Sequence, residues 1–220
     1  MDLGTLAVLL SVWIAAIASP GPDVVQIIRL GSRTRSDGVA CALGIMLGNT
    51  LWIVGSLLGL SALVHAEPLI LTVLKIIGGC YLLWMGVGAI RSGVRGNDGA
   101  VTALEGQRPV NRNIHLSTSF VGSLRLGILT NLSNPKALIF FAAIFAQFVQ
   151  PGMNFVVAFV IASTLIITGI MWFVGVALVV HSVSSFLRRH SVMIEVICGF
   201  VFIVLALVML YGGISELFYV

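Results

Sequence analysis

Residues 3–28 read LGTLAVLLSVWIAAIASPGPDVVQII, and this stretch contains a single charged residue, Asp23. A helix needs about 20 mostly apolar residues to cross the hydrocarbon core of a bilayer, so the stretch is long enough to span a membrane. It also contains Pro20-Gly21-Pro22, which cannot continue a straight helix because proline lacks an N–H donor and its ring clashes with the preceding turn. The stretch therefore predicts a membrane-spanning helix that is broken part-way along.

The rest of the chain repeats this apolar character. Hydrophobic residues make up 59% of the 220 residues and charged residues only 9%, and the mean hydropathy is +1.11. A soluble domain usually carries about 25% charged residues, so this composition excludes a soluble enzyme domain. We predict an all-α membrane protein with six transmembrane helices. Five further apolar runs follow the first, at 38–64, 69–90, 114–149, 153–180 and 192–214.

Some features of the sequence resemble those of other classes of protein. Residues 16–18 resemble a signal-peptide cleavage site, but no Lys or Arg precedes them, so we expect 3–28 to be retained. The three cysteines, Cys41, Cys80 and Cys198, are far apart in apolar runs and predict neither a metal site nor a redox relay or other cofactor. The net charge of +4 does not indicate nucleic-acid binding, because the arginines occupy short gaps between apolar runs.

The gaps between the runs differ in charge on the two sides of the expected membrane. With six spans, the gaps 29–37, 91–113 and 181–191 share one side. They contain Arg29, Arg33, Arg35, Arg91, Arg95, Arg108, Arg112, Arg188 and Arg189. The opposite side has no Lys or Arg in its gaps, and its charged residues are Asp2, Glu67 and Glu216. Because cytoplasmic loops are rich in Lys and Arg, we expect a multi-pass protein of a bacterial inner membrane with both termini in the periplasm.

The long polar segment 91–113 divides the six spans into two groups of three. We therefore treat residues 1–220 as a single polytopic domain, with halves 1–90 and 114–220 joined by a cytoplasmic linker. Since three is an odd number, the second half enters the membrane in the opposite sense to the first. This arrangement predicts the 3+3 inverted repeat that many secondary transporters have.

The first helix of the second half also contains a helix-breaking motif, Asn131-Leu132-Ser133-Asn134-Pro135-Lys136. Asn134 suits an N-cap and Pro135 the first helical position, and Pro22 has the same character in the first half. Each break thus predicts a half-helix that begins inside the membrane, where its free N–H groups favour a carboxylate. The alternative, that both motifs are simple proline kinks, stays open.

Two charged residues flank these breaks. A charge at mid-bilayer costs about 2.5–3.5 kcal/mol on insertion scales, which makes Asp23 and Lys136 functional candidates. Lys136 lies beside a positive helix end and so needs an anion, either Asp23 or a substrate carboxylate. Asp23 would bind a substrate ammonium and carry a proton, or else only stabilise the first turn of its helix. We predict a substrate site made of Pro20, Gly21, Pro22, Asp23, Asn49, Asn131, Asn134, Pro135 and Lys136.

Asn49 belongs to this set because it follows Gly44-x-x-x-Gly48, a pattern typical of closely packed membrane helices. It either lines the cavity or bridges two helices. One carboxylate and one ammonium in the site match a zwitterion, and a second positive group on the cargo would meet Lys136. We therefore expect a neutral or weakly polar amino acid rather than lysine or arginine.

The segments 19–23, 44–49 and 131–141 resemble the signatures of the LysE/RhtB family of lysine exporters and homoserine–threonine resistance translocators. The length, six spans and central basic linker are also similar, so the resemblance covers the whole chain. It implies a secondary transporter, not an enzyme, that exports amino acids or close derivatives in exchange for protons. Its partners would be the amino acid, protons and the lipid bilayer. The resemblance leaves open whether the protein forms a homo-oligomer.

Two other functions remain as alternatives. An exporter of another small solute or of a cation has a similar architecture, but a cation site would need several carboxylate, His or Cys ligands, and Asp23 is a single carboxylate. A membrane scaffold that transports nothing would not need two broken spans.

Overall fold

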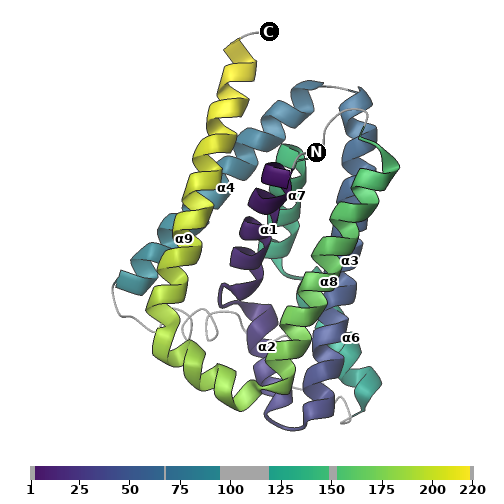
Figure 1. Cartoon of the computed structure of the whole chain (residues 1–220), viewed down its shortest axis with the longest axis vertical. Coiled ribbons are helices and arrows are strands. Elements are labelled where there is room, and N and C mark those ends of the chain that lie inside the picture. Colours follow the sequence, from purple (N-terminus) through teal and green to yellow (C-terminus); the bar gives the residue numbers. More distant parts are fainter. Residues whose placement is uncertain (1–2, 67, 95–118, 149–152, 219–220) are drawn as a thin grey trace.

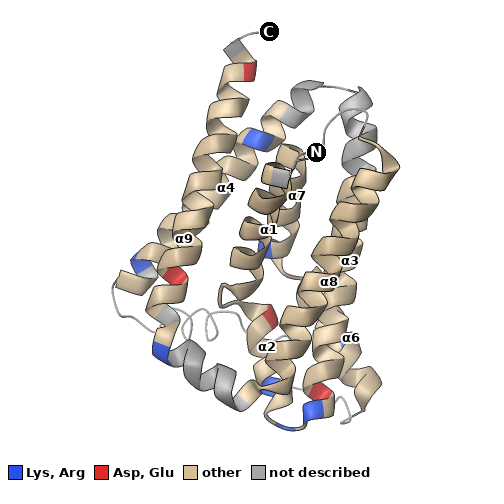
Figure 2. Ribbon diagram, viewed as in Figure 1, with Lys and Arg blue, Asp and Glu red and all other residues tan. Residues whose placement is uncertain are grey.

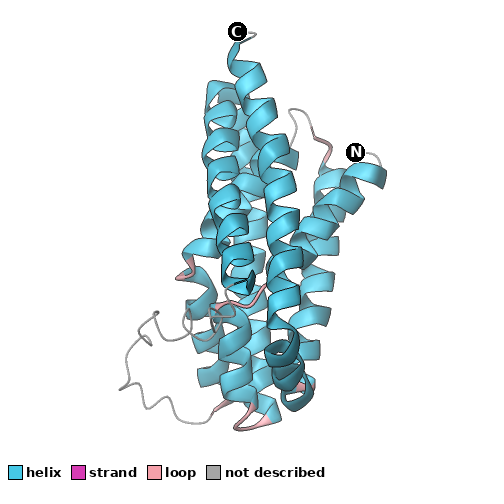
Figure 3. Cartoon of the chain, turned by 90° about the vertical axis from the view of Figure 1, so that its left-hand side faces the viewer, coloured by secondary structure: helices cyan, strands magenta, loops and turns pink. Residues whose placement is uncertain are grey.

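The computed structural model describes residues 3–66, 68–94, 119–148 and 153–218, and the regular structure in these ranges is entirely helical. This agrees with the predicted all-α class. The helices lie mostly along one long axis (Figures 1 and 3). They are α1 (Leu3–Ala18), α2 (Pro22–Gly31), α3 (Arg35–Ala66), α4 (Pro68–Val94), α6 (Phe120–Leu132), α7 (Pro135–Phe148), α8 (Phe155–Leu178) and α9 (Val180–Phe218).

Four of these helices, α3, α4, α8 and α9, are each long and apolar enough to cross a membrane. The other four form two bent pairs. The helix axis bends by 53° between α1 and α2, and by 58° between α6 and α7. If each bent pair is one span, the described part of the chain has up to six spans, and otherwise it has four.

The first bend follows from the local sequence. The last turn of α1 closes with a 3.0 Å hydrogen bond from the Ser19 N–H to the Ala15 carbonyl. Gly21 then adopts an extended conformation, with φ −164° and ψ −177°, and its carbonyl accepts the N–H of Val25 at 3.1 Å. Pro22 is the first residue of α2, where its missing N–H removes no helical hydrogen bond.

The second bend has similar chemistry. Helix α6 ends where the Ser133 N–H donates to the Leu129 carbonyl at 3.0 Å. The side-chain Oδ1 of Asn134 then accepts the backbone N–H of Lys136 at 3.0 Å, as expected of an N-cap residue. Helix α7 begins directly after Asn134.

Residues 181–191, the expected gap between the last two apolar runs, are helical, and they separate the candidate spans Phe155–Leu178 and Val192–Leu217. Helix α9 begins at Val180 and continues through these residues to Phe218, and its first part runs across the lower end of the molecule before the helix turns upward (Figure 1). The gap between these two candidate spans is therefore a helical segment and not a loop.

The other gaps are only partly described. Helix α4 continues to Val94, so the first residues of the expected linker 91–113 are helical. The rest of that linker, Glu67 and the expected turn at 150–152 lie outside the described residues.

Glycines allow several helices to contact each other backbone to backbone. A Cβ added to Gly44 of α3 would lie 2.1 Å from the Leu124 carbonyl oxygen of α6, and one on Gly127 would lie 2.2 Å from the Cys41 carbonyl oxygen. Helices α4 and α9 approach each other in the same way through Gly86 and Gly199. The Gly44-x-x-x-Gly48 pattern thus marks a close helix contact.

The charged residues lie at different levels of the bundle. Figure 2 shows several of them around the lower ends of the helices, with others in the middle of the bundle and toward its upper end. Both termini lie toward the upper part of the molecule (Figure 1). The last turn of α2 carries Arg29 and that of α4 carries Arg91, and both helices run away from the end where the C-terminus lies (Figure 1).

Candidate functional site

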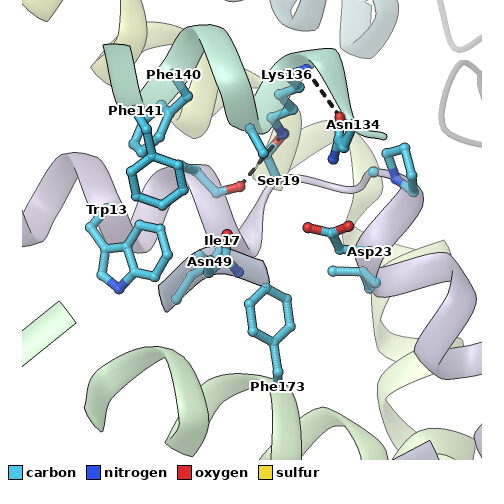
Figure 4. A pocket seen from close by; sticks show the side chains of 15 residues that line it. Trp13, Ile17, Ser19, Asp23, Asn49, Asn134, Lys136, Phe140, Phe141 and Phe173 are labelled. Carbon is cyan, nitrogen blue, oxygen red and sulfur yellow. Dashed lines mark hydrogen bonds between the residues drawn. The ribbon is translucent and has the colours of Figure 1, made fainter. Parts of the chain in front are cut away.

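A cavity of about 40 Å³ lies where the two bends come together. At about 10–15 Å³ for each water molecule, it holds about three waters. Its wall combines residues of the first bend with side chains from α1, α2, α3, α7 and α8 (Figure 4). The lining residues are Trp13, Ala16, Ile17, Ser19, Gly21, Pro22, Asp23, Val24, Asn49, Asn134, Lys136, Ala137, Phe140, Phe141 and Phe173.

Most of the predicted site residues are brought together at this cavity. The six that line it are Gly21, Pro22, Asp23, Asn49, Asn134 and Lys136. Pro20 and Asn131 do not line the wall, and the side chain of Pro135 lies outside the described part of the chain. Asn131 instead lies behind the wall and contacts two of the lining residues.

Only one of the two oxygens of the Asp23 carboxylate accepts a hydrogen bond from the described residues. Its Oδ2 accepts a 2.9 Å hydrogen bond from the side-chain amide of Asn131. Its Oδ1 is buried and has no hydrogen-bond partner among the described residues. A buried carboxylate oxygen without a donor is costly, so Oδ1 is a site for a proton, a water molecule or a cationic ligand.

Lys136 reaches the same cavity from α7. Its Nζ lies 3.5 Å from the carbonyl oxygen of Ala16, near the end of α1 (Figure 4). A Cβ added to Gly21 would lie 3.8 Å from this Nζ, so the ammonium is close to the start of α2. Within the described ranges, no ion pair joins Lys136 to Asp23. The cavity therefore contains a carboxylate and an ammonium that do not neutralise each other by direct contact.

The two helix starts at the cavity differ in how their free N–H groups are used. At α7, Asn134 caps the N–H of Lys136. At α2, the N-cap residue is Gly21, which has no side chain to accept a hydrogen bond. The N–H groups of Asp23 and Val24 in the first turn of α2 are left available for an anion, and the nearby Lys136 ammonium adds positive charge there.

An aromatic wall completes the cavity, and the predicted site did not include it. It consists of Trp13, Phe140, Phe141 and Phe173, which are each no more than 3% exposed. The rings of Trp13 and Phe141 lie 5.6 Å apart between centroids. The two phenylalanines of α7 follow Lys136 by one helical turn, so helical spacing could have placed them. Trp13 and Phe173 join the cavity through tertiary packing, and no motif marks them.

The arrangement matches a small zwitterion in three respects. The start of α2 and Lys136 suit a carboxylate, and the free Oδ1 of Asp23 suits an ammonium group. The aromatic wall suits an uncharged side chain, since it offers no polar partner on that side.

Comparison with known proteins gives independent information. The model of the LysE type translocator family matches residues 14–213. The threonine efflux protein of Salmonella typhimurium is 33% identical over 167 residues, which cover 76% of this chain and 77% of that protein. The threonine efflux protein of Escherichia coli K12 is 34% identical over the same shares of the two chains.

More distant relatives match a larger part of the chain. An uncharacterized membrane protein of Haemophilus influenzae is 25% identical over 215 residues, which cover 95% of this chain and 97% of that protein. No solved structure matches the chain. Together with the four to six candidate spans, these relatives identify a multi-pass membrane protein.

Proposed function

The chain belongs to the LysE type translocator family, and we propose that it exports an amino acid or a close derivative from the cytoplasm by proton antiport. The membrane would be a bacterial inner membrane, with both termini in the periplasm. The threonine efflux proteins that are about one third identical to this chain support an amino acid as cargo.

The observation that carries this proposal is the cavity with separate charges. The unpaired Oδ1 of Asp23 and the ammonium of Lys136 face the same space between two helix bends. A zwitterionic amino acid supplies both opposite charges, with its carboxylate at Lys136 and the first turn of α2 and its ammonium at Asp23. A neutral solute would leave both charges unpaired.

The aromatic wall supports a limit on the cargo side chain. Trp13, Phe140, Phe141 and Phe173 offer ring faces and no carboxylate, and a cationic side chain would also face Lys136. We therefore propose a neutral or weakly polar amino acid, of the size of threonine, over lysine or arginine. The cavity has room for about three water molecules, so the transport cycle must widen it to admit this cargo.

The arrangement of the bent pairs supports a 3+3 inverted repeat. In Figure 1, α1 and α7 occupy the upper half of the molecule, and α2 and α6 the lower half. The first pair thus runs downward through its bend, and the second pair runs upward. We propose that each pair is one broken span and that halves 1–90 and 114–220 rock against each other around the cavity.

Proton coupling supplies the energy in this proposal. A zwitterion carries no net charge across the membrane, so export against a gradient needs a coupled ion. One inward proton gains about 2.3 kcal/mol per 100 mV, which at about 1.36 kcal/mol per decade sustains roughly a 50-fold gradient. Asp23 is the carboxylate in the cavity, and a proton on it would release the cargo ammonium.

The test is uptake of labelled amino acids into inverted membrane vesicles with an imposed proton gradient, normalised to protein abundance. Asp23→Asn keeps the shape of the side chain and removes its charge, so we expect the variant to insert normally and lose proton-driven uptake. Glu216→Gln is the matched control, because Glu216 pairs with Lys75 away from the cavity. Wild-type uptake by Asp23→Asn at equal abundance would eliminate the proposed role of Asp23.

A further inference from the structure

Asn131 is completely buried at the last turn of α6, and both hydrogens of its side-chain amide are used. One donates to Oδ2 of Asp23 at 2.9 Å, and the other donates to Oδ1 of Asn49 at 3.0 Å. This single amide therefore joins α2, α3 and α6 directly behind the cavity. Because its nitrogen already makes both bonds, Asn131 has no donor left for cargo.

The orientation of the Asn131 amide is determined by its neighbours. Rotation of the amide by half a turn would place its oxygen against the Asp23 carboxylate and the Asn49 oxygen, so that acceptors would face acceptors. The Asn131 Oδ1 has no hydrogen-bond partner among the described residues and packs instead against Gly48. A Cβ on Gly48 would lie 2.6 Å from Oδ1 and 2.9 Å from the Asn131 Cβ. Gly48 thus provides the space that Asn131 occupies.

We propose that Asn131 is a positioning residue that acts through Asp23 and does not bind cargo. It holds Oδ2 of the carboxylate, and this leaves Oδ1 as the oxygen that receives the cargo ammonium. Gly48 contributes to this positioning, because a side chain at Gly48 would displace the Asn131 amide. The inference rests on the proposed function for the identity of the cargo.

The hydrogen bond from Asn131 to Asp23 also makes the contact between α2 and α6 sensitive to the charge of Asp23. A hydrogen bond from an amide to an ionised carboxylate is about twice as strong as one to a neutral group. Neutralisation of Asp23 therefore weakens the link between α2 and α6, while the bond from Asn131 to Asn49 stays neutral in both states. Asn131 thus makes the α2–α6 contact depend on what Asp23 binds.

The first experiment compares alanine substitutions at two glycines of α3, Gly48 and Gly55. Exchange of labelled threonine against internal threonine is measured in vesicles without a proton gradient, so that the KM and Vmax for cargo are obtained separately. If the protein does not exchange threonine, a panel of neutral amino acids is tested and the one that is exchanged fastest is used instead. Gly48→Ala should raise the KM about tenfold, the scale of one lost charge-assisted hydrogen bond, with little change in Vmax. Gly55→Ala is the matched control, since a Cβ at Gly55 meets nothing within 4 Å.

The second experiment separates positioning from a direct or merely structural role. Asn131→Leu keeps a similar volume and removes both donors, and it should raise the KM by a similar factor at normal abundance. In an Asp23→Asn background the same substitution should have little further effect, because Asn131 acts through the carboxylate.

The outcomes separate the two proposals. If Gly48→Ala and Asn131→Leu both keep the wild-type KM, or if the effect of Asn131→Leu is undiminished in the Asp23→Asn background, the positioning role is overturned and the proposed export function stands. If the wild-type protein exchanges no amino acid, the proposed function fails and the inference fails with it.

Discussion

At the residue scale, Lys136 is a cation that lines the cavity close to the start of a helix. Its ammonium is near the start of α2, where the helix dipole is positive, and it donates a long hydrogen bond of 3.5 Å to the Ala16 carbonyl. A cation in this position is poorly satisfied until an anion enters the cavity. The physical consequence is that Lys136 should contribute more to cargo binding than to folding.

We therefore expect Lys136→Met to raise the KM for amino-acid exchange at least about tenfold, which corresponds to the loss of a charge-assisted hydrogen bond. The fold should persist, because the substitution removes a charge that is costly inside a membrane unless it is paired. Exchange kinetics in vesicles would measure the effect. Lys75→Met is the control, since Lys75 pairs with Glu216 and does not line the cavity. Equal KM values for the two variants would contradict this role for Lys136.

A second residue-scale feature lies at the start of α3. Asp37 was expected in the gap between the first two runs, but it is only 4% exposed. Its two carboxylate oxygens accept 2.7 Å hydrogen bonds from the hydroxyls of Ser123 on α6 and Thr34. The carboxylate is therefore part of the contact between the two halves of the chain.

Ser123→Ala should lower the free energy of unfolding by about 1–3 kcal/mol, the usual effect of leaving a buried acceptor without its donor. Thermal or denaturant unfolding in detergent would measure this change. The control is Ser11→Ala, because the exposed Ser11 hydroxyl bonds only to a carbonyl of its own helix. A stability indistinguishable from that of the Ser11 variant would show that the Asp37–Ser123 bond contributes nothing.

At the element scale, the contact between α3 and α6 depends on small residues. Gly44 and Gly127 let the two backbones approach, and this approach brings Asn49 within hydrogen-bond distance of Asn131. In lipid, where apolar side chains gain little from mutual burial, such van der Waals contact and interhelical hydrogen bonds are the main attraction between helices. The same contact that joins the helices thus forms the back of the cavity.

Gly127→Ala should be destabilising by about 1–3 kcal/mol, because its Cβ would overlap the Cys41 carbonyl and force the helices apart. Gly175→Ala on α8 should be neutral or slightly stabilising, since nothing lies within 4 Å of that Cβ and alanine is the better helix former. Melting temperatures of the two purified variants would test the contrast. Equal stabilities would mean that α3 and α6 tolerate a wider separation.

At the scale of the whole molecule, the distribution of basic residues is the basis of the proposed orientation in the membrane. Both termini lie toward the upper part of the bundle, and several charged residues lie around its lower end (Figures 1 and 2). Helix α9 begins at Val180, and Arg188 and Arg189 precede its candidate span Val192–Leu217. The helical structure of 181–191 therefore leaves the predicted charge asymmetry unchanged.

A reporter that is active only in the cytoplasm should be inactive when fused after Val220 and active when inserted in the linker near Arg108, because the basic side stays inside. The measurement is reporter activity per molecule of fusion protein in intact cells. High activity at the C-terminus would reverse the proposed orientation.

The local sequence alone determines the helical class of this protein and the positions where its broken helices restart, without reference to tertiary contacts. The apolar runs determined the helical class, because a backbone in lipid must satisfy its hydrogen bonds within each helix. Pro22 and Asn134 marked where helices start, because the properties of an N-cap and of proline act within one turn. The arginines predicted an orientation, which depends on charge counts and not on packing.

Only the tertiary structure decided how distant residues meet. Asn131 reaches Asp23 across 108 positions of the chain, and Trp13 and Phe173 share a wall although no motif relates them. It also decided that Lys136 and Asp23 face one cavity without forming an ion pair, and that Asp37 is buried. These facts depend on how closely the helices approach and on how they are rotated about their axes. Helical periodicity assigns a residue to a face, but the partner of that face is chosen by packing across the whole bundle.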